Sequence, residues 1–576
     1  MITGLAALSL DALSSVAYGP EAMMLVLIVA GSGALHWTLP ITLVITGMLV
    51  LLVISYSQVI EAHPDGGGAY AVCKRNLGRG SALLAAASLV VDYVLTVAVS
   101  LAAGAASLGS VFPSLSNHLL LVSLIGLAIL TAVNMFGIAE SARLLLFPAA
   151  IFIVSVLTTI VIGLVHSHSD AIIGRSLAPG TQALGIVLLL KAFAAGCSAV
   201  TGVEAIANGV PAFRKPRVRT AQRTEIALGV LLGVMLVGLA VLVHIHHVRP
   251  RNGVTVLAQL TAGSFGTGWP FYVSNLAITA VLALAANTSF GGLPVLMSLL
   301  AKDHRLPHVF YLRAERPVYR TGIIALGLAA MLLLFAVGAQ TNRLIPLYAI
   351  GVFLGFTLSQ IGLVKHWRQE HSSRWRLRAS VNGAGAVMTA IAVVVFLASK
   401  FLEGAWVVTL AVPLLIFLFA RTEIYYRDVA RELKLGLTPP LPCKRESIVI
   451  VPSSTVNLLT ERALSAALSL GDTVVAVAVA ADEEERTRIR RNWGEWECGA
   501  PIEVIIDPRR SLIRSVLRYI ESINEPDVTV TVLIAEILPR KRRHEILHNQ
   551  RGRLLAAVLK ARTDVIVATL PFRLHD

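Results

Sequence analysis

The sequence predicts an α-helical integral membrane protein with twelve spans, followed by a small α/β domain. Hydrophobic residues make up 56% and charged residues only 14% of the 576 residues, and the mean hydropathy is +0.74. These values lie well beyond those of a soluble globular chain. Apolar runs of about 20 residues, the length that crosses a bilayer, recur as far as residue 421. After that point, short β-rich runs alternate with helical ones.

The apolar runs define twelve candidate spans, which form a domain over residues 1–421. In order, the spans cover residues 3–31, 38–62, 83–111, 117–136, 144–165, 182–209, 224–244, 270–300, 322–338, 343–363, 380–399 and 405–421. The first run carries Asp11 and Glu21 and has no basic stretch before it, which is not the pattern of a cleaved signal peptide.

The distribution of basic residues predicts the orientation of the spans. Connections that follow even-numbered spans hold 19 Lys and Arg, and those that follow odd-numbered spans hold 5. Because positive loops stay in the cytoplasm, both termini are expected there. This topology accounts for the net charge of +15, so the charge does not point to a nucleic-acid partner.

The segment after the last span is predicted to be a linker and a second domain. Residues 422–445 are amphipathic and then rich in proline, as expected of a linker. Residues 446–576 contain five β-rich runs with helical runs between them, which predicts a parallel sheet covered on both faces. The order is similar to a universal-stress-type fold, but the glycine-rich phosphate loop is absent. Regulation or dimerisation is therefore expected of this domain, and the chain is not expected to be an enzyme.

Polar residues and helix breakers interrupt the apolar sequence of the first span. Asp11 lies about eight residues into the span, and the following residues include Ser14, Ser15, Gly19 and Pro20. Proline suits the first turn of a helix and not its interior. We therefore predict a discontinuous helix with an unwound middle.

A second interruption falls in the sixth span, "KAFAAGCSAVTGVEAIANGVP". Thr201, Gly202 and Glu204 lie at mid-depth. Two broken helices five spans apart are typical of an inverted five-plus-five repeat, in which the substrate site forms where both helices unwind. Asp11 and Tyr18 are expected to face that site.

Hydroxyl-bearing residues on two other spans complete a candidate site. Tyr93, Thr96 and Ser100 are spaced three and four apart on the third span, so they share one helical face. The tenth span supplies Tyr348. Each hydroxyl alone is more typical of a helix–helix hydrogen bond, but together with the carboxyls of the broken spans they favour a site.

Other polar residues in the spans carry less weight. Asp92 points about 100° away from Tyr93 on an ideal helix, so packing or a salt bridge, for example to Lys191, is as good an interpretation as proton transfer. Two groups of histidines lie near the predicted outer ends of spans, where solvated interfaces are expected and a metal site is not. These are His166 and His168, and His244, His246 and His247.

The donor set of the candidate site indicates the class of ligand. Carboxylates, hydroxyls and free carbonyls without a neighbouring Arg or Lys suit a hard monovalent cation, because oxygen dipoles can replace its hydration shell. The carboxylate of an amino acid would instead need backbone amides at a glycine-rich break, and residues 14–18 read Ser-Ser-Val-Ala-Tyr. A cation is favoured, and a cationic organic substrate held by Asp11 and Glu204 stays open.

Three motifs resemble those of the amino acid–polyamine–organocation (APC) superfamily of transporters. They are "HPDGGGAYAVCKRNLG" after the second span, "TGVEAIANGVPAFRKPRVRTAQR" around the sixth and "ANTSFGGLPVLMSLLAKDHRLPHVF" around the eighth. The resemblance covers most of residues 1–421. It implies the LeuT-like fold, a five-plus-five inverted repeat with two extra helices.

Within that superfamily, the first-span pattern "DALSSVAY" and the stress-protein-like tail are similar to bacterial potassium importers of the KUP and KimA types. This resemblance implies proton-coupled potassium symport in the bacterial cytoplasmic (inner) membrane, with Glu204 by preference, or Asp11, carrying the proton. It also implies a homodimer joined through the tails and inhibition by cyclic di-AMP, with no other cofactor. The implied potassium-binding residues are Asp11, Tyr18, Tyr93, Thr96, Ser100, Thr201, Glu204 and Tyr348.

Two other functions remain open at this point. An amino-acid or polyamine permease fits the superfamily motifs equally well. A membrane receptor, with the spans as sensor and the tail as output, is disfavoured because the tail carries no catalytic or kinase motif.

Overall fold

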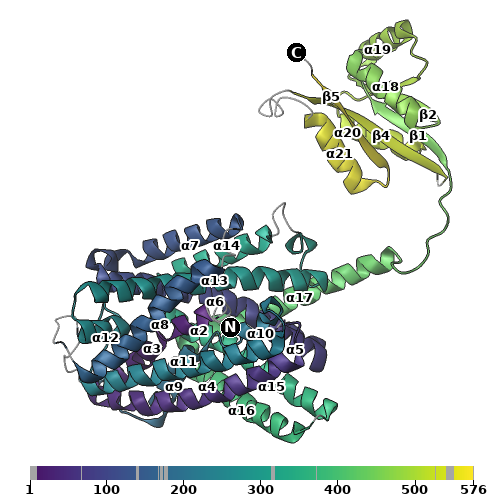
Figure 1. Ribbon diagram of the computed structural model, residues 1–576. Helices are drawn as coiled ribbons and strands as arrows, with labels where there is room; N and C mark the ends of the chain where they lie inside the picture. Colours follow the sequence, from purple (N-terminus) through teal and green to yellow (C-terminus); the bar gives the residue numbers. More distant parts are fainter. Residues whose placement is uncertain are drawn as a thin grey trace. The chain divides into compact units, whose positions relative to one another are not determined.

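The computed structural model describes residues 9–574, apart from 67, 138–141, 167, 169–172, 174–179, 313–317, 372, 524, 526 and 540–549. Residues 3–8 of the predicted first span therefore lie outside the described residues. The chain forms two compact units, Met1–Leu435 and Gly436–Asp576 (Figure 1).

The first unit is a helical bundle. Twelve helices or broken helices among the described residues are long and apolar enough to cross a membrane, as predicted. They are α2 to η1 (Leu10–Ala30), η2 to α4 (Ser32–Ala62), α6 (Arg79–Val111), η3 to α7 (Pro113–Met135), α8 (Ala142–Val165), α9 to α10 (Ile186–Asn208), α11 (Arg217–His246), α13 (Trp269–Lys302), α14 (Arg320–Val337), α15 (Thr341–Glu370), α16 (Trp375–Lys400) and α17 (Trp406–Glu432). Two shorter helices connect them, α5 (Gly68–Asn76) and α12 (Val256–Phe265).

The burial of the spans separates a central group from a rim. In the most apolar stretch of α6, 78% of the residues are buried, and in that of α15, 83% are buried. In the corresponding stretches of α7 and α17, only 17% of the residues are buried. The rim helices expose apolar side chains, as expected where lipid is the solvent. Polar side chains on α6 and α15 therefore lie inside the bundle, which is where a site would need them.

The last helix differs from the prediction. The sequence placed the end of the membrane domain at residue 421, but α17 continues to Glu432. Glu423 on the extension lies 2.9 Å from the Arg79 guanidinium and 3.7 Å from that of Arg305. These ion pairs tie the helical extension to the bundle, so the chain beyond residue 421 stays helical and the linker is shorter than predicted.

The second unit contains a five-stranded parallel sheet, as the alternating pattern predicted. Its order is β3-β2-β1-β4-β5. The elements are β1 (Glu446–Pro452), α18 (Leu458–Leu470), β2 (Thr473–Ala480), α19 (Glu483–Trp496), β3 (Ile502–Ile506), α20 (Leu512–Ile523), β4 (Val528–Leu538), α21 (Gln550–Arg562) and β5 (Ile566–Arg573). Helices α18 and α19 cover one face and α20 and α21 the other (Figure 1). Each face buries its own apolar cluster, so the β-rich runs are apolar on both sides.

Candidate functional site

The first span is broken as the sequence predicted. Helix α2 (Leu10–Ser15) ends before residues 16–18, which form turns, and α3 (Gly19–Leu27) begins after them with Pro20 in its first turn. The Ser14 hydroxyl donates to the Asp11 carbonyl at 2.8 Å, and the Ser15 hydroxyl donates to the Ala12 carbonyl at 2.6 Å. Both serine hydroxyls are therefore bonded to backbone carbonyls of their own helix turn.

The sixth span unwinds at the predicted position. Helix α9 (Ile186–Gly196) passes into the 3₁₀ helix η4 (Cys197–Val200), and α10 (Ala205–Asn208) resumes after a turn. Within that turn, Thr201 is extended and Gly202 has φ +82°. Only glycine adopts such a φ without strain, so Gly202 makes the turn possible.

The two breaks pack directly against each other. The Ser15 hydroxyl also donates to the Ala199 carbonyl at 2.7 Å. A Cβ on Gly202 would lie 2.6 Å from the Ala12 amide nitrogen and 2.9 Å from Asp11 Oδ2. The absence of a side chain at residue 202 thus allows the sixth span to approach the Asp11 carboxyl.

Four of the predicted site residues gather at this junction. The Tyr18 hydroxyl lies beside Thr201 and Tyr348, and Tyr348 lies beside Asp11. All four side chains are buried, with 8% or less of their surface exposed. Asp11 Oδ1 and the hydroxyls of Tyr18 and Tyr348 have no hydrogen-bond partner among the described residues. Because buried oxygens of this kind are costly, they are suited to bind a ligand.

A second group adjoins the first. The carboxyls of Asp11, Asp92 and Glu204 are close enough for their charges to interact. The Thr96 hydroxyl lies 3.5 Å from Asp92 Oδ1, and Tyr93 lies within reach of the charges of all three carboxyls. The structure therefore brings Glu204, Tyr93 and Thr96 to the same region as Asp11.

Ser100 is a predicted residue for which the described part of the chain shows no contact with this group. It lies one turn beyond Thr96 on α6 and is 1% exposed. Its hydroxyl has no hydrogen-bond partner among the described residues. The shared helical face is as predicted, but no contact links Ser100 to the carboxyls in the described part of the chain.

Sequence reasoning underestimated Asp92 and missed Glu225. Asp92 is 4% exposed and interacts with the other carboxyls, although helical geometry predicted that it would point away from Tyr93. Glu225 is fully buried in α11. A carboxyl inside an apolar span is itself a signal of function, and Glu225 lies at the start of the predicted seventh span, directly after the basic run that ends at Arg223.

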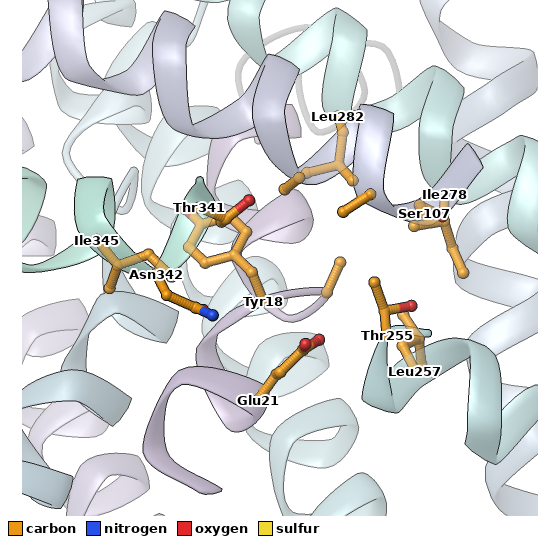
Figure 2. Close-up of a pocket in the computed structure, with 13 residues that line it drawn as sticks. Tyr18, Glu21, Ser107, Thr255, Leu257, Ile278, Leu282, Thr341, Asn342 and Ile345 are labelled. Atoms are coloured by element: carbon orange, nitrogen blue, oxygen red, sulfur yellow. The ribbon is translucent and has the colours of Figure 1, made fainter. Parts of the chain in front are cut away.

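A narrow pocket lies beside Tyr18 (Figure 2). It measures about 30 Å³, enough for roughly one or two water molecules. Tyr18 and Glu21 from the first span contribute to its wall, with Thr255, Thr341 and Asn342. The Glu21 carboxylate accepts a hydrogen bond from the Val256 amide at 3.1 Å. The structure is therefore nearly closed on this side of Tyr18.

The end of the bundle that carries the basic loops holds a larger and more open pocket of about 580 Å³. Its polar lining includes Glu61, Arg75, His366 and Arg378. We refer to it as the basic-end pocket.

His63, directly after α4, gives a testable pH dependence at this end. Burial, followed by the charges of His366 and Arg75, lowers the pKa of His63 to about 4. The folded protein therefore holds His63 neutral, and its stability is complete above about pH 6.5 and declines as the pH falls toward 4. For His63 alone, the expected loss between about pH 7.5 and 5 is about 2 kcal/mol. Thermal unfolding in detergent should show a smaller acid shift for His63→Gln, and an unchanged shift would contradict this origin.

Comparisons with known proteins agree with this architecture. The family model described as "Amino acid permease" matches residues 6–419, and that of the KimA potassium transporter C-terminal domain matches residues 444–572. The chain is 37% identical to the potassium transporter KimA of Bacillus subtilis (strain 168) over 99% of this chain and 95% of that protein.

More distant similarities cover part of this chain. Cationic amino acid transporter 4, vacuolar, of Arabidopsis thaliana is 25% identical over 52% of this chain and 52% of that protein. A crystal structure of the Eremococcus coleocola manganese transporter covers 75% of this chain and 95% of that one, with 13% identity and a TM-score of 0.39. The full-length similarity and the two family matches decide the assignment. The chain therefore belongs to the KimA family within the APC superfamily.

Proposed function

We propose that this multi-pass membrane protein is a secondary-active potassium importer whose cation site lies between the two broken spans. The observation that carries the proposal is the convergence of buried, unpartnered oxygens from Asp11, Tyr18 and Tyr348 at the junction of the breaks. The full-length similarity to a protein named as a potassium transporter supports potassium as the cargo.

In this proposal the oxygens replace the hydration shell of K⁺. Tyr18, Tyr93, Thr96, Ser100, Thr201 and Tyr348 supply dipoles, while Asp11 and Glu204 balance the charge. Ser100 contributes its hydroxyl only if the cation site extends one turn further along α6, beyond Thr96. The narrow pocket beside Tyr18 and the wider basic-end pocket support opening on alternate sides.

Several finer features belong to the same proposal. The fold is a five-plus-five inverted repeat, both termini face the cytoplasm of a bacterial cell, and the membrane is the inner one. The second unit is a universal-stress-like regulatory domain that joins two copies of the chain and responds to cyclic di-AMP. Its parallel sheet and the KimA C-terminal match support this view of the unit.

The second candidate is a permease for a cationic amino acid or polyamine. The similarity of the membrane unit to the Arabidopsis cationic amino acid transporter favours it. The two acidic residues Asp11 and Glu204 would bind the amine. The first-span break argues against an amino acid, because its serines are bonded to backbone carbonyls and it offers no glycine-rich amide cradle.

The test is growth of a bacterium that lacks its potassium importers, on limiting potassium, with and without this protein. Rescue is the expected result. If well-expressed protein at the membrane fails to rescue growth, the potassium proposal loses its support, and an uptake screen of amino acids and polyamines tests the second candidate.

Proton coupling is proposed to depend on Glu204. Replacing Glu204 by Gln keeps the size of the side chain but removes its capacity to exchange a proton. Proton-driven accumulation of ⁸⁶Rb⁺, used as a tracer for K⁺, should fall roughly a hundredfold in proteoliposomes, the low end of the effect of removing a proton-transfer group. If Glu204→Gln accumulates as much ⁸⁶Rb⁺ as the wild type, at equal amounts of reconstituted protein, Glu204 does not carry the coupled proton.

A further inference from the structure

Glu225 is a buried carboxyl outside the proposed cation site. Helix α11 packs along α4. The Gln222 amide donates to the Ser57 carbonyl at 2.9 Å, and a Cβ on Gly229 would lie 2.6 Å from Val53. Residues 222, 225 and 229 share one helical face, so Glu225 faces α4 between these two contacts.

The carboxyl has no structural partner that would explain its presence. Glu225 is 0% exposed, and neither of its oxygens has a hydrogen-bond partner among the described residues. An unpaired buried carboxylate is costly in a membrane, and an apolar side chain of similar size would stabilise the bundle better. A group that takes up and releases a proton is the function that this placement suits.

Tyr56 lies where the charges of Glu225 and of the proposed site both act. It lies on α4 and is 1% exposed. Its hydroxyl is within reach of the charges of both Glu204 and Glu225, and the charge of Glu204 acts on Glu225. The other ionisable group whose charge acts on Tyr56 is Asp92. Glu225 lies about 9 Å along α11 from the helix midpoint, on the side of the basic loops, at 1.5 Å per residue.

Polar contacts continue from there toward the basic-end pocket. Tyr56 lies beside Ser359 on α15. On the face of α4 opposite Tyr56, the Asn382 amide donates to Gln58 Oε1 at 2.8 Å. Arg378 donates to Glu61 at 2.9 Å, and both residues line the basic-end pocket. The interface of α4 with α16 is therefore polar next to the basic-end pocket.

We propose that Glu225 is a second proton-carrying residue, which relays the coupled proton between Glu204 and the basic-end pocket. This rests on the proposed proton-coupled import. In the transfer, the Glu204 carboxyl releases its proton and becomes a carboxylate, and the Glu225 carboxylate takes up one proton and becomes a neutral carboxyl. Glu225 then releases this proton toward the pocket and returns to the carboxylate.

The test separates cation exchange from proton-driven accumulation in proteoliposomes that contain the full-length protein. Exchange of ⁸⁶Rb⁺ against internal K⁺ needs no net proton transfer, whereas accumulation under an imposed proton gradient does. Glu225→Gln should lose accumulation at least tenfold and retain exchange within about twofold. Thr224→Val, at the equally buried neighbour whose hydroxyl bonds the Thr220 carbonyl at 2.8 Å, should retain both, and Glu225→Asp should recover part of the accumulation.

Two results would overturn the proposal: undiminished accumulation by Glu225→Gln, or loss of exchange together with accumulation in a folded variant. If Glu225→Gln does not fold, the proposal is tested by labelling the wild type with a hydrophobic carbodiimide, because this reagent modifies protonated buried carboxyls. Labelling of Glu225 that falls as the pH rises is expected, and no labelling overturns the relay. Failure of the proposed import is recognised separately, because wild type would then accumulate no ⁸⁶Rb⁺.

Discussion

The Asp11→Asn variant is expected to lose potassium uptake almost completely, by more than a hundredfold. The substitution preserves size but removes the charge that faces the unpartnered hydroxyl of Tyr348. Removing one partner of a buried ionic interaction costs about 3–5 kcal/mol, and each 1.4 kcal/mol is a factor of about ten in affinity. The measurement is ⁸⁶Rb⁺ uptake at equal amounts of reconstituted protein.

Glu21→Gln is the matched control for this prediction. Glu21 lies on the same broken span, but its carboxylate accepts a hydrogen bond from the Val256 amide. It is not one of the three carboxyls, those of Asp11, Asp92 and Glu204, whose charges interact. It should retain most of the uptake. Equal uptake by Asp11→Asn and wild type would contradict the placement of the cation between the breaks.

The second large effect is expected from Gly202→Ala. The new methyl would overlap the Ala12 amide and Asp11 Oδ2, and alanine would have to adopt φ +82°. The left-handed backbone alone costs about 1 kcal/mol, and the overlap must push the broken spans apart. Uptake should fall at least tenfold, with the thermal midpoint lowered.

Gly253→Ala is the control that separates the effect of backbone strain from the effect of the steric overlap at residue 202. Gly253 has the same φ of +82°, but no atom lies within 4 Å of its Cβ position. It should lose some stability and keep its uptake. If both variants transport equally well, the close packing of the two breaks is not required for the site.

Much of the fold could be predicted because its signals are local. Apolar length defines a span, and the two breaks follow from Ser14, Ser15, Pro20 and Gly202, whose backbone preferences act within one turn. The β-rich runs likewise identify the parallel sheet. Helix α17 continues past residue 421 to Glu432, and its contact with the bundle there, between Glu423 and Arg79, joins residues that are remote in the sequence.

The site was predictable in composition but not in its contacts. The carboxyls and hydroxyls are conspicuous in apolar spans, which identified Asp11 and Tyr348. The interlocking of Ser15 with Ala199 joins residues 184 positions apart, so no local pattern encodes it. For the same reason, the position of Asp92 relative to Asp11 and the isolation of Ser100 required the packed structure.

Uptake by the purified protein in proteoliposomes tests the central claim most directly. The liposomes carry an inward proton gradient, and ⁸⁶Rb⁺ uptake is measured with excess unlabelled K⁺ or lysine as competitor. The proposed cation site predicts gradient-dependent uptake that K⁺ abolishes and lysine leaves intact. Absence of ⁸⁶Rb⁺ uptake, together with gradient-dependent uptake of labelled lysine, would contradict the potassium proposal and favour the cationic permease.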